Sequence, residues 1–356
     1  MREECTEGGF SLVEMMVGLA IGMIATLVIV QVASTFEGQK RSTTGAADAQ
    51  TTGGIALYTI QRQVQMGGYG LPVYSQQNQA LDCAAEPKVD HDGNAGTPDI
   101  GIAPVVIVDG GAGLSDAITV RMGSTAAGGV PLRVTSLPDL AMKRVTVTNN
   151  LSCTPLGAGG LDVALITDGA NCALRKIAAL APAPDSWIQL DDVSDAAIHS
   201  GSTLACLGQW RETSYTINGN RLLENGVEIA GDIVNLQARY GVSNAANSSQ
   251  VLPDSYVDAT DPTWGAAMTA ANRNRIKSIR IALVVRSGAM EKEDVTSACS
   301  SLTDPNPTGL CAWAGTPTNP APSIDLSADA NWKKYRYRVF DTVIPVRNMI
   351  WSAGAL

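Results

Sequence analysis

The sequence predicts an α+β protein in which one long amino-terminal helix precedes a head of antiparallel strands with long, disulfide-stapled loops. Three observations predict this class. An uncharged run over residues 15–36 is long enough to cross a bilayer as a helix. Short apolar and polar alternations, separated by glycine and asparagine turns, follow from residue 105 onward. Six cysteines follow the apolar run, an even number that suggests disulfides in an oxidising compartment.

The first element is a helix that we expect over residues 10–66, with a membrane span at 12–36. Beyond the span the sequence becomes more polar, and Ala56, Ile60 and Val64 recur every four residues. This spacing predicts one apolar stripe, by which the second half of the helix packs on the head.

Glycines mark two places in that second half. Gly53 and Gly54 each cost about 1 kcal/mol relative to alanine in a helix, so we expect a bend or local melting there. Residues 67–72, with the sequence GGYGLP, combine glycines and a proline. This combination predicts that the helix ends at residue 66.

Strands are predicted for much of the head. Candidate segments are 105–108, 117–121, 144–148, 162–166, 187–190, 215–217, 221–223, 233–240, 276–286 and 332–346. Asn218-Gly219-Asn220 predicts a tight hairpin between two of them, and Asn225-Gly226 extends the hairpin to a meander. The segments 241–272 and 287–331 are expected to be long loops.

Cys5 precedes the helix, and six further cysteines follow it. These six are the disulfide candidates Cys83, Cys153, Cys172, Cys206, Cys299 and Cys311. An even number beyond a membrane anchor predicts disulfides, and the absence of C-x-x-C spacing argues against zinc or thioredoxin-like chemistry. Many pairings remain open. A shared turn-rich segment favours Cys299 with Cys311, and Cys153 with Cys172 is the next expectation.

Composition argues against several functions. The formal net charge of −9 is unfavourable for binding nucleic acid. His91 and His199 are the only histidines and lie in no catalytic motif, and no nucleophile elbow or P-loop occurs. We therefore expect no catalytic residue, no metal and no cofactor. The alternating carboxylates of residues 90–99 leave a calcium loop and a solvated acidic loop as open hypotheses.

One glutamate stands at the start of the apolar helix, within the sequence GGFSLVEMM of residues 8–16. An ionisable group this close to hydrocarbon costs roughly 2.5 kcal/mol or more, so Glu14 is expected to have a partner or a function. Gly18 and Gly22 form a G-x-x-x-G pair, which lets a second helix approach closely. A plain anchor whose glutamate reaches the interface, and a cleaved signal peptide, are the alternatives.

Gly9-Phe10 followed by Glu14 resembles the processing site of type IV prepilins. Further along, four segments are similar, in the same order, to PilW-type minor pilins, namely 57–71, 232–242, 276–287 and 335–348. The chain is thus similar to the type IV pilin and pseudopilin superfamily, which includes the GspJ-like pseudopilins. The resemblance implies the type IV pilin fold, a long transmembrane helix packed on an antiparallel β-sheet.

The resemblance also implies a processing route. Residues 1–9 would be a prepilin leader. A prepilin peptidase would cut between Gly9 and Phe10 and methylate the new amine of Phe10. Glu14 would then pair with that amine on a neighbouring subunit, which agrees with the need of a carboxylate near hydrocarbon for a cation.

Location follows from the same resemblance. The head, residues 67–356, would lie in the periplasm, anchored in the bacterial inner membrane by a single span and later carried into the extracellular fibre. Gly18 and Gly22 would lie in the helix interface. Charge opposes this orientation, because Arg2 precedes the span whereas Lys40 and Arg41 follow it, and the positive-inside rule alone would place the amino terminus outside.

The implied function is that of a minor pilin, a fimbrial subunit that helps to prime type IV pilus assembly, joins the fibre at or near its tip and supports twitching motility. Its partners would be the prepilin peptidase, other minor pilins, the major pilin and a pilus-tip adhesin. One alternative is a GspJ-like minor pseudopilin of a type II secretion system. Another is a membrane-anchored periplasmic enzyme.

Overall fold

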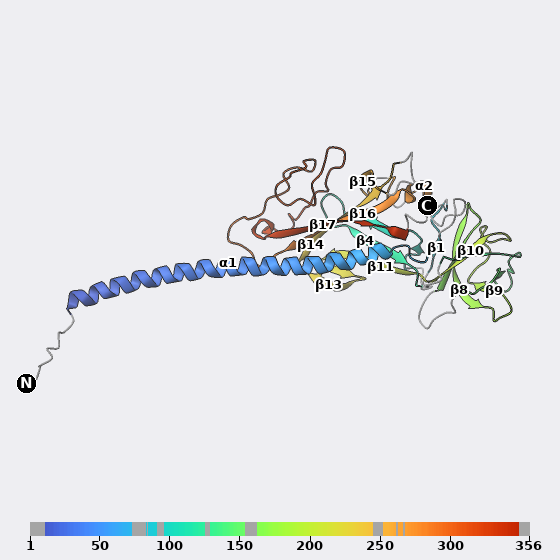
Figure 1. Cartoon of the computed structure of the whole chain (residues 1–356), viewed down its shortest axis with the longest axis horizontal. Coiled ribbons are helices and arrows are strands. Elements are labelled where there is room, and N and C mark those ends of the chain that lie inside the picture. Colours follow the sequence, from blue (N-terminus) through green and yellow to red (C-terminus); the bar gives the residue numbers. More distant parts are fainter. Residues whose placement is uncertain are drawn as a thin grey trace, which may run out of the picture.

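The structure is a computed structural model that describes residues 11–72, 83, 85–90, 96–124, 129–153, 162–244, 252–260, 263–265 and 268–348. One long helix projects from a β-rich head, so the molecule is elongated (Figure 1). The long apolar helix, the mostly antiparallel sheets and the three disulfides confirm the α+β class.

Helix α1 (Leu12–Met66) is unbroken and ends at the predicted glycine cluster. Gly68 has a φ of 77°, a conformation that favours glycine, and its amide donates to the Arg121 carbonyl at 2.8 Å. The Asn348 side chain donates from Nδ2 to the Gly67 carbonyl at 3.0 Å. The helix end is therefore held by two segments that are distant in the sequence.

The second half of α1 packs on the head through small side chains. Its buried residues are Gly45, Ala49, Gly53, Ala56, Ile60 and Val64. This stripe faces strands β16 (Ile276–Arg286) and β17 (Tyr337–Pro345), which lie beside the helix (Figure 1). The predicted stripe is confirmed, and it extends toward the amino terminus by three small residues.

Position 53 of this stripe requires a glycine, because the ring of Phe340 occupies the space that a Cβ atom would take. A Cβ atom at Gly53 would lie 2.1 Å from Cε2 of Phe340, whereas one at Gly54 would meet nothing within 4 Å. The predicted melting at Gly53 is wrong, since the helix continues through it. Close packing with Phe340 offsets the low helix propensity of glycine.

The sheet beneath α1 has four strands in the order β15-β14-β16-β17. The two strands not yet defined are β14 (Ile233–Val242) and β15 (Ser255–Val257). On the far face, Val339 and Ala282 pack with Trp313 from the loop that joins β16 to β17. Both faces of the sheet are thus covered, which explains why β16 is buried along nearly its whole length.

The two predicted loops differ in outcome. Residues 287–331 contain no helix or strand, as expected. The segment 241–272 instead contains the short strand β15 and the start of α2 (Ala270–Arg273). A 3₁₀ turn, η1 (Trp332–Lys334), precedes β17 where the sequence predicted a longer strand.

A five-stranded sheet in the order β13-β12-β11-β4-β3 completes the central head. Its strands are β3 (Val105–Val108), β4 (Ala117–Met122), β11 (Arg211–Asn218), β12 (Arg221–Glu224) and β13 (Val227–Gly231). Gly219 and Asn220 have φ of 58° and 62°, and Asn225 and Gly226 also have positive φ. These tight turns confirm the predicted hairpin and meander.

A third sheet forms a lobe at the end of the head that lies away from the free half of α1 (Figure 1). Its strands, in spatial order, are β5 (Pro131–Arg133), β10 (Thr203–Gln209), β7 (Asp162–Thr167), β8 (Cys172–Leu180), β9 (Trp187–Leu190) and β6 (Arg144–Thr146). The two end strands meet at the antiparallel bridge between Val134 and Val147, so the sheet closes on itself. We call this lobe, residues 131–209, the distal barrel.

The distal barrel is an insertion between neighbouring strands. It leaves β4 after Met122 and returns at Arg211 of β11, and these two residues lie opposite each other in the five-stranded sheet. It encloses a hydrophobic core of its own. We predicted one head over 67–356, and within that range the structure describes three hydrophobic clusters, of which one belongs to the distal barrel alone.

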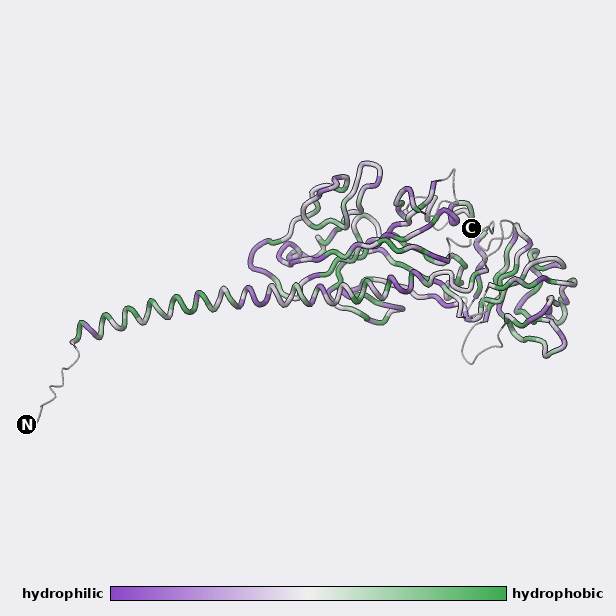
Figure 2. The backbone as a smooth tube through the Cα atoms, in the orientation of Figure 1, coloured by the Kyte–Doolittle hydropathy of each residue, from purple (hydrophilic) through white to green (hydrophobic). Residues whose placement is uncertain are grey.

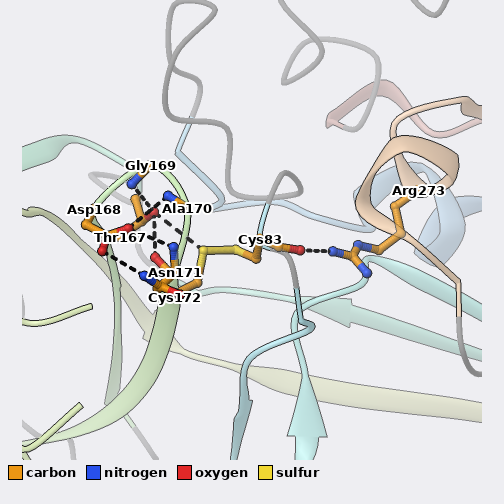
Figure 3. Close-up of a disulfide and its surroundings, with 8 residues drawn as sticks. All are labelled: Cys83, Thr167, Asp168, Gly169, Ala170, Asn171, Cys172 and Arg273. Atoms are coloured by element: carbon orange, nitrogen blue, oxygen red, sulfur yellow. Dashed lines mark hydrogen bonds between the residues drawn. A yellow bond between two sulfur atoms is a disulfide. The ribbon is translucent and has the colours of Figure 1, made fainter. Parts of the chain in front are cut away.

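The three disulfides have distinct positions. Cys299–Cys311 closes a loop over the four-stranded sheet, as predicted. Cys153–Cys206 lies inside the distal barrel, and Cys83–Cys172 ties strand β8 of the barrel to the segment that follows α1 (Figure 3). The predicted pairing of Cys153 with Cys172 is wrong, because Cys153 packs against β10, whereas Cys172 begins β8 on the other side of β7.

A buried carboxylate joins two of the sheets. Asp116, which is 4 % exposed, accepts hydrogen bonds from the Ala238 amide at 2.7 Å and the Gly110 amide at 3.1 Å. These bonds connect the β3–β4 turn to β14. Burial raises the pKa of Asp116 from 3.8 to about 7, although the two amides favour its charged form.

The Gly53→Ala variant should have a free energy of unfolding about 1–3 kcal/mol lower than that of the Gly54→Ala variant. Only the methyl group at position 53 meets the Phe340 ring. Both substitutions gain the same helix propensity, so their difference isolates the collision. Urea unfolding of the full chain in detergent, followed by circular dichroism, measures it. Equal stabilities of the two variants would contradict the packing argument.

Replacing Asp116 by asparagine should remove one component of the pH dependence of stability. The raised pKa means that the folded state binds the proton more tightly than the unfolded state, so the stabilisation is present below pH 4 and is lost as the pH rises to about 7. Relative to Asp116→Asn, the wild type should lose on the order of 2–4 kcal/mol over that interval. A difference between the two proteins that stays constant with pH would disprove this assignment.

Candidate assembly surface

The first half of α1 extends beyond the head as an apolar rod. No residue of the helix before Gly45 is buried, and its large apolar side chains from Leu12 to Phe36 are exposed. Figure 2 shows this free segment as mainly hydrophobic. At about 1.5 Å per residue it projects roughly 50 Å. Among the described residues, α1 is the one helix long and apolar enough to cross a membrane, and it fits a membrane anchor.

The rod begins at a capping box. Ser11 Oγ accepts from the Val13 amide at 3.4 Å, and Glu14 Oε2 accepts from the Ser11 amide at 3.4 Å. These contacts satisfy backbone donors that the first turn of a helix leaves free. Glu14 is exposed and forms no ion pair with any residue that the structure describes. In hydrocarbon such a carboxylate is costly unless it has a partner.

The predicted processing residues precede the described part of the chain. Gly9 and Phe10 lie outside the described residues, and so does Cys5. The cut site, the methylated amine and the pairing of that amine with Glu14 therefore stay predictions.

Gly18 and Gly22 lie on the free rod, where the head does not cover them. A Cβ atom at either position would meet nothing within 4 Å. One turn further, the Thr26 hydroxyl donates to the Gly22 carbonyl at 3.0 Å and so turns inward to the backbone. This face offers a second helix a surface with little steric obstruction.

The head approaches the end of the span at a place that we did not predict from the sequence. The loop of residues 287–295 lies beside α1 near Gly45, where a Cβ atom on the glycine would be 3.4 Å from Ser287 Cβ. Hollows between this loop and α1 are lined by Arg41 and Lys40 of the helix. The charged residues just after the span were the available sequence signal, and they gave no information about their partner in the fold.

His199 lies on the distal barrel, away from α1. Its Nε2 atom is 3.7 Å from Asp168 Oδ2, and its Nδ1 atom is 2.9 Å from the Ser200 carbonyl. Burial alone would raise the pKa of Asp168, but hydrogen bonds from Asn171 and Ala170 lower it to about 2. The contact connects two turns of the barrel.

The acidic segment 90–99 is described only in part. His91 and the acidic, glycine and asparagine residues up to 94 fall outside the described residues, so the calcium hypothesis cannot be tested there. Within the described part of the chain, no group of three or more His, Cys, Asp or Glu residues is placed to hold a metal ion.

Comparison with known families gives one match. Residues 200–348 match the family model described as Type IV Pilus-assembly protein W, PilW. The matched region runs from β10 through β17, whereas α1 and most of the distal barrel lie outside it. No significant match was found among curated proteins or among solved structures. The family match, together with an amino-terminal helix that fits a membrane anchor, relates this chain to type IV pilus assembly.

Proposed function

We propose that the chain is a minor pilin that helps to prime type IV pilus assembly and enters the fibre at or near its tip. The observation that carries the proposal is the division of α1. Its first half is a free apolar rod with an outward glutamate, and its second half is docked on strands of the region that matches PilW. A subunit that packs laterally through helices requires such a rod, and the PilW match of the docked strands favours this function over a membrane-anchored enzyme.

The proposed mechanism is binding rather than catalysis. The span holds the subunit in the inner membrane after the prepilin peptidase has removed residues 1–9. Gly18 and Gly22 let the helix of another pilin approach, and Glu14 meets the methylated amine of Phe10 on that pilin. A carboxylate and an ammonium that are both withdrawn from water stabilise the assembled pair only when they meet each other.

The distal barrel supports a position at the tip. It extends past the carboxyl end of α1, away from the membrane rod (Figure 1). In a fibre, further subunits would have to stack beyond the heads already in place. A large lobe in that space suits the end of a fibre better than its shaft.

A GspJ-like pseudopilin of a type II secretion system would use the same rod and the same glutamate. Deletion of the gene distinguishes the two functions. Loss of a minor pilin should leave the cell with few or no pili and with normal secretion. Loss of a pseudopilin should leave normal pili and impair type II secretion.

Glu14→Ala should yield a processed, membrane-anchored protein that does not support piliation. The substitution leaves the amine of the neighbouring subunit unpaired in an apolar environment, at a cost of about 3–5 kcal/mol. We expect at least about tenfold fewer pili by electron microscopy of the complemented deletion strain. Gln31→Ala, which removes another polar side chain of the span without changing charge, is the matched control. Wild-type pilus numbers with Glu14→Ala would refute the pairing.

Gly9→Leu should leave the leader attached, because a bulky side chain blocks the cut between Gly9 and Phe10. The expected result is a protein heavier than the mature wild type by the mass of the leader, detected by mass spectrometry of the purified membrane fraction. Gly8→Ala should be processed normally. A Gly9→Leu protein with the mature mass would show that cleavage occurs elsewhere.

A further inference from the structure

The base of the head forms a fixed contact at the point where α1 leaves the proposed membrane span. The loop 287–295 is bound to η1 and the residues after it, since the Glu291 amide donates to the Lys334 carbonyl at 2.8 Å. The Ser287 amide donates to the Arg336 carbonyl at 2.8 Å, and Arg336 Nε donates to Glu291 Oε1 at 2.9 Å. The loop therefore has a defined position next to the helix.

Two hollows lie between this loop and the helix. One, of about 370 Å³, is lined by Arg41 and Ser34 of α1 together with Met290 and Lys292 of the loop. The other, of about 410 Å³, is lined by Lys40 and Arg41, so that Arg41 borders both. We call the first one the basal hollow.

The basal hollow lies at the depth of lipid head groups. The apolar span ends at Phe36. Arg41 is five positions further along, about 8 Å at the rise of an α-helix. The polar layer of a bilayer is about 5–8 Å thick on each side of the hydrocarbon. A helix that crosses the membrane with residues 12–36 therefore places the backbone of Arg41 near the outer edge of the head-group layer, from which its long side chain can reach a phosphate.

Two of the charged residues that line the basal hollow, Arg336 and Glu291, pair with each other, whereas Arg41, Lys292 and Glu293 are exposed. Among the described residues, no ion pair is formed by Arg41, Lys292 or Glu293, nor by Glu37 and Lys40 beside the second hollow. Both signs of charge are present. This suits a zwitterionic head group, whose phosphate would meet the cations and whose ammonium would meet the carboxylates. The exposed Met290 at the loop tip adds an apolar side chain that can enter the interface.

We propose that the basal hollow binds a zwitterionic phospholipid head group, with the phosphate held by Arg41 and Lys292. This proposal rests on the membrane location given by the proposed function. It has a consequence for assembly. The contact holds the head on the bilayer surface while the subunit waits, and it must break when the subunit leaves the membrane for the fibre.

Amide hydrogen exchange of the full chain tests the proposal. The chain is placed in nanodiscs of phosphatidylcholine and phosphatidylethanolamine, in maltoside micelles, and in maltoside micelles with inorganic phosphate. Amides of residues 288–294 should exchange about tenfold more slowly in nanodiscs than in either micelle, which corresponds to about 1.4 kcal/mol of added protection. Arg41→Gln with Lys292→Gln should abolish the difference. The matched control is Arg133→Gln, an exposed cation of the distal barrel, and it should preserve the difference.

Each other outcome overturns the assignment. Equal exchange in all three media, or slowing that survives in the double variant, excludes a lipid site at these residues. Slowing by inorganic phosphate alone makes the site an anion site without lipid selectivity. Slowing in micelles as the protein concentration rises assigns the hollow to a second chain. Retention of the protein by bilayers after alkaline extraction is scored separately, so that failure of the hollow is distinguished from failure of the membrane anchor.

Discussion

One helix in contact with two different environments is the constraint on which this structure depends. Residues 15–36 in the first half of α1 are uncharged and mainly apolar, whereas the second half has one narrow apolar stripe and a polar remainder. The helix runs through both halves without a break. The free segment and the docked segment therefore belong to one continuous element.

The head is adapted to hold this helix closely. The docking stripe consists largely of glycine and alanine, and at Gly53 the Phe340 ring fills the volume that a side chain would take. The sheet beneath is covered on its second face by the segment that follows the Cys299–Cys311 loop, between β16 and β17. The distal barrel has a separate core and enters between two adjacent strands, so it can be added without disturbing the docked helix. Cys83–Cys172 then limits its freedom relative to the helix end.

Much of the central head could be predicted from the sequence, because its signals are local. The Asn-Gly turns favour the positive φ that tight hairpins need, and the strands beside them alternate clearly between apolar and polar residues.

Prediction failed where tertiary packing, and not a local pattern, determines the secondary structure or the disulfide partner. Strand β8, with the sequence CALRKIAAL, is rich in helix-forming residues and was missed, as was β10, which contains a glycine and a register shift. The partner of Cys172 lies outside the barrel, at a sequence separation of 89, and no spacing argument indicates it. In the candidate site, Glu14, Gly18 and Gly22 were singled out because a charge or a small residue is conspicuous in an apolar run, and their role in assembly stays a prediction. The approach of the loop 287–295 was not, since contacts between distant segments leave no local pattern.

The central claim is that Glu14 enters the membrane as the fifth residue of a processed chain and is neutralised there by another subunit. Mass spectrometry of the amino-terminal peptide from the membrane fraction tests it most directly, since it reports location, cut site and modification together. The account predicts a peptide that begins at Phe10 and carries a methyl group on its amine. A chain that begins at Met1, or one that begins after the apolar run, would contradict it.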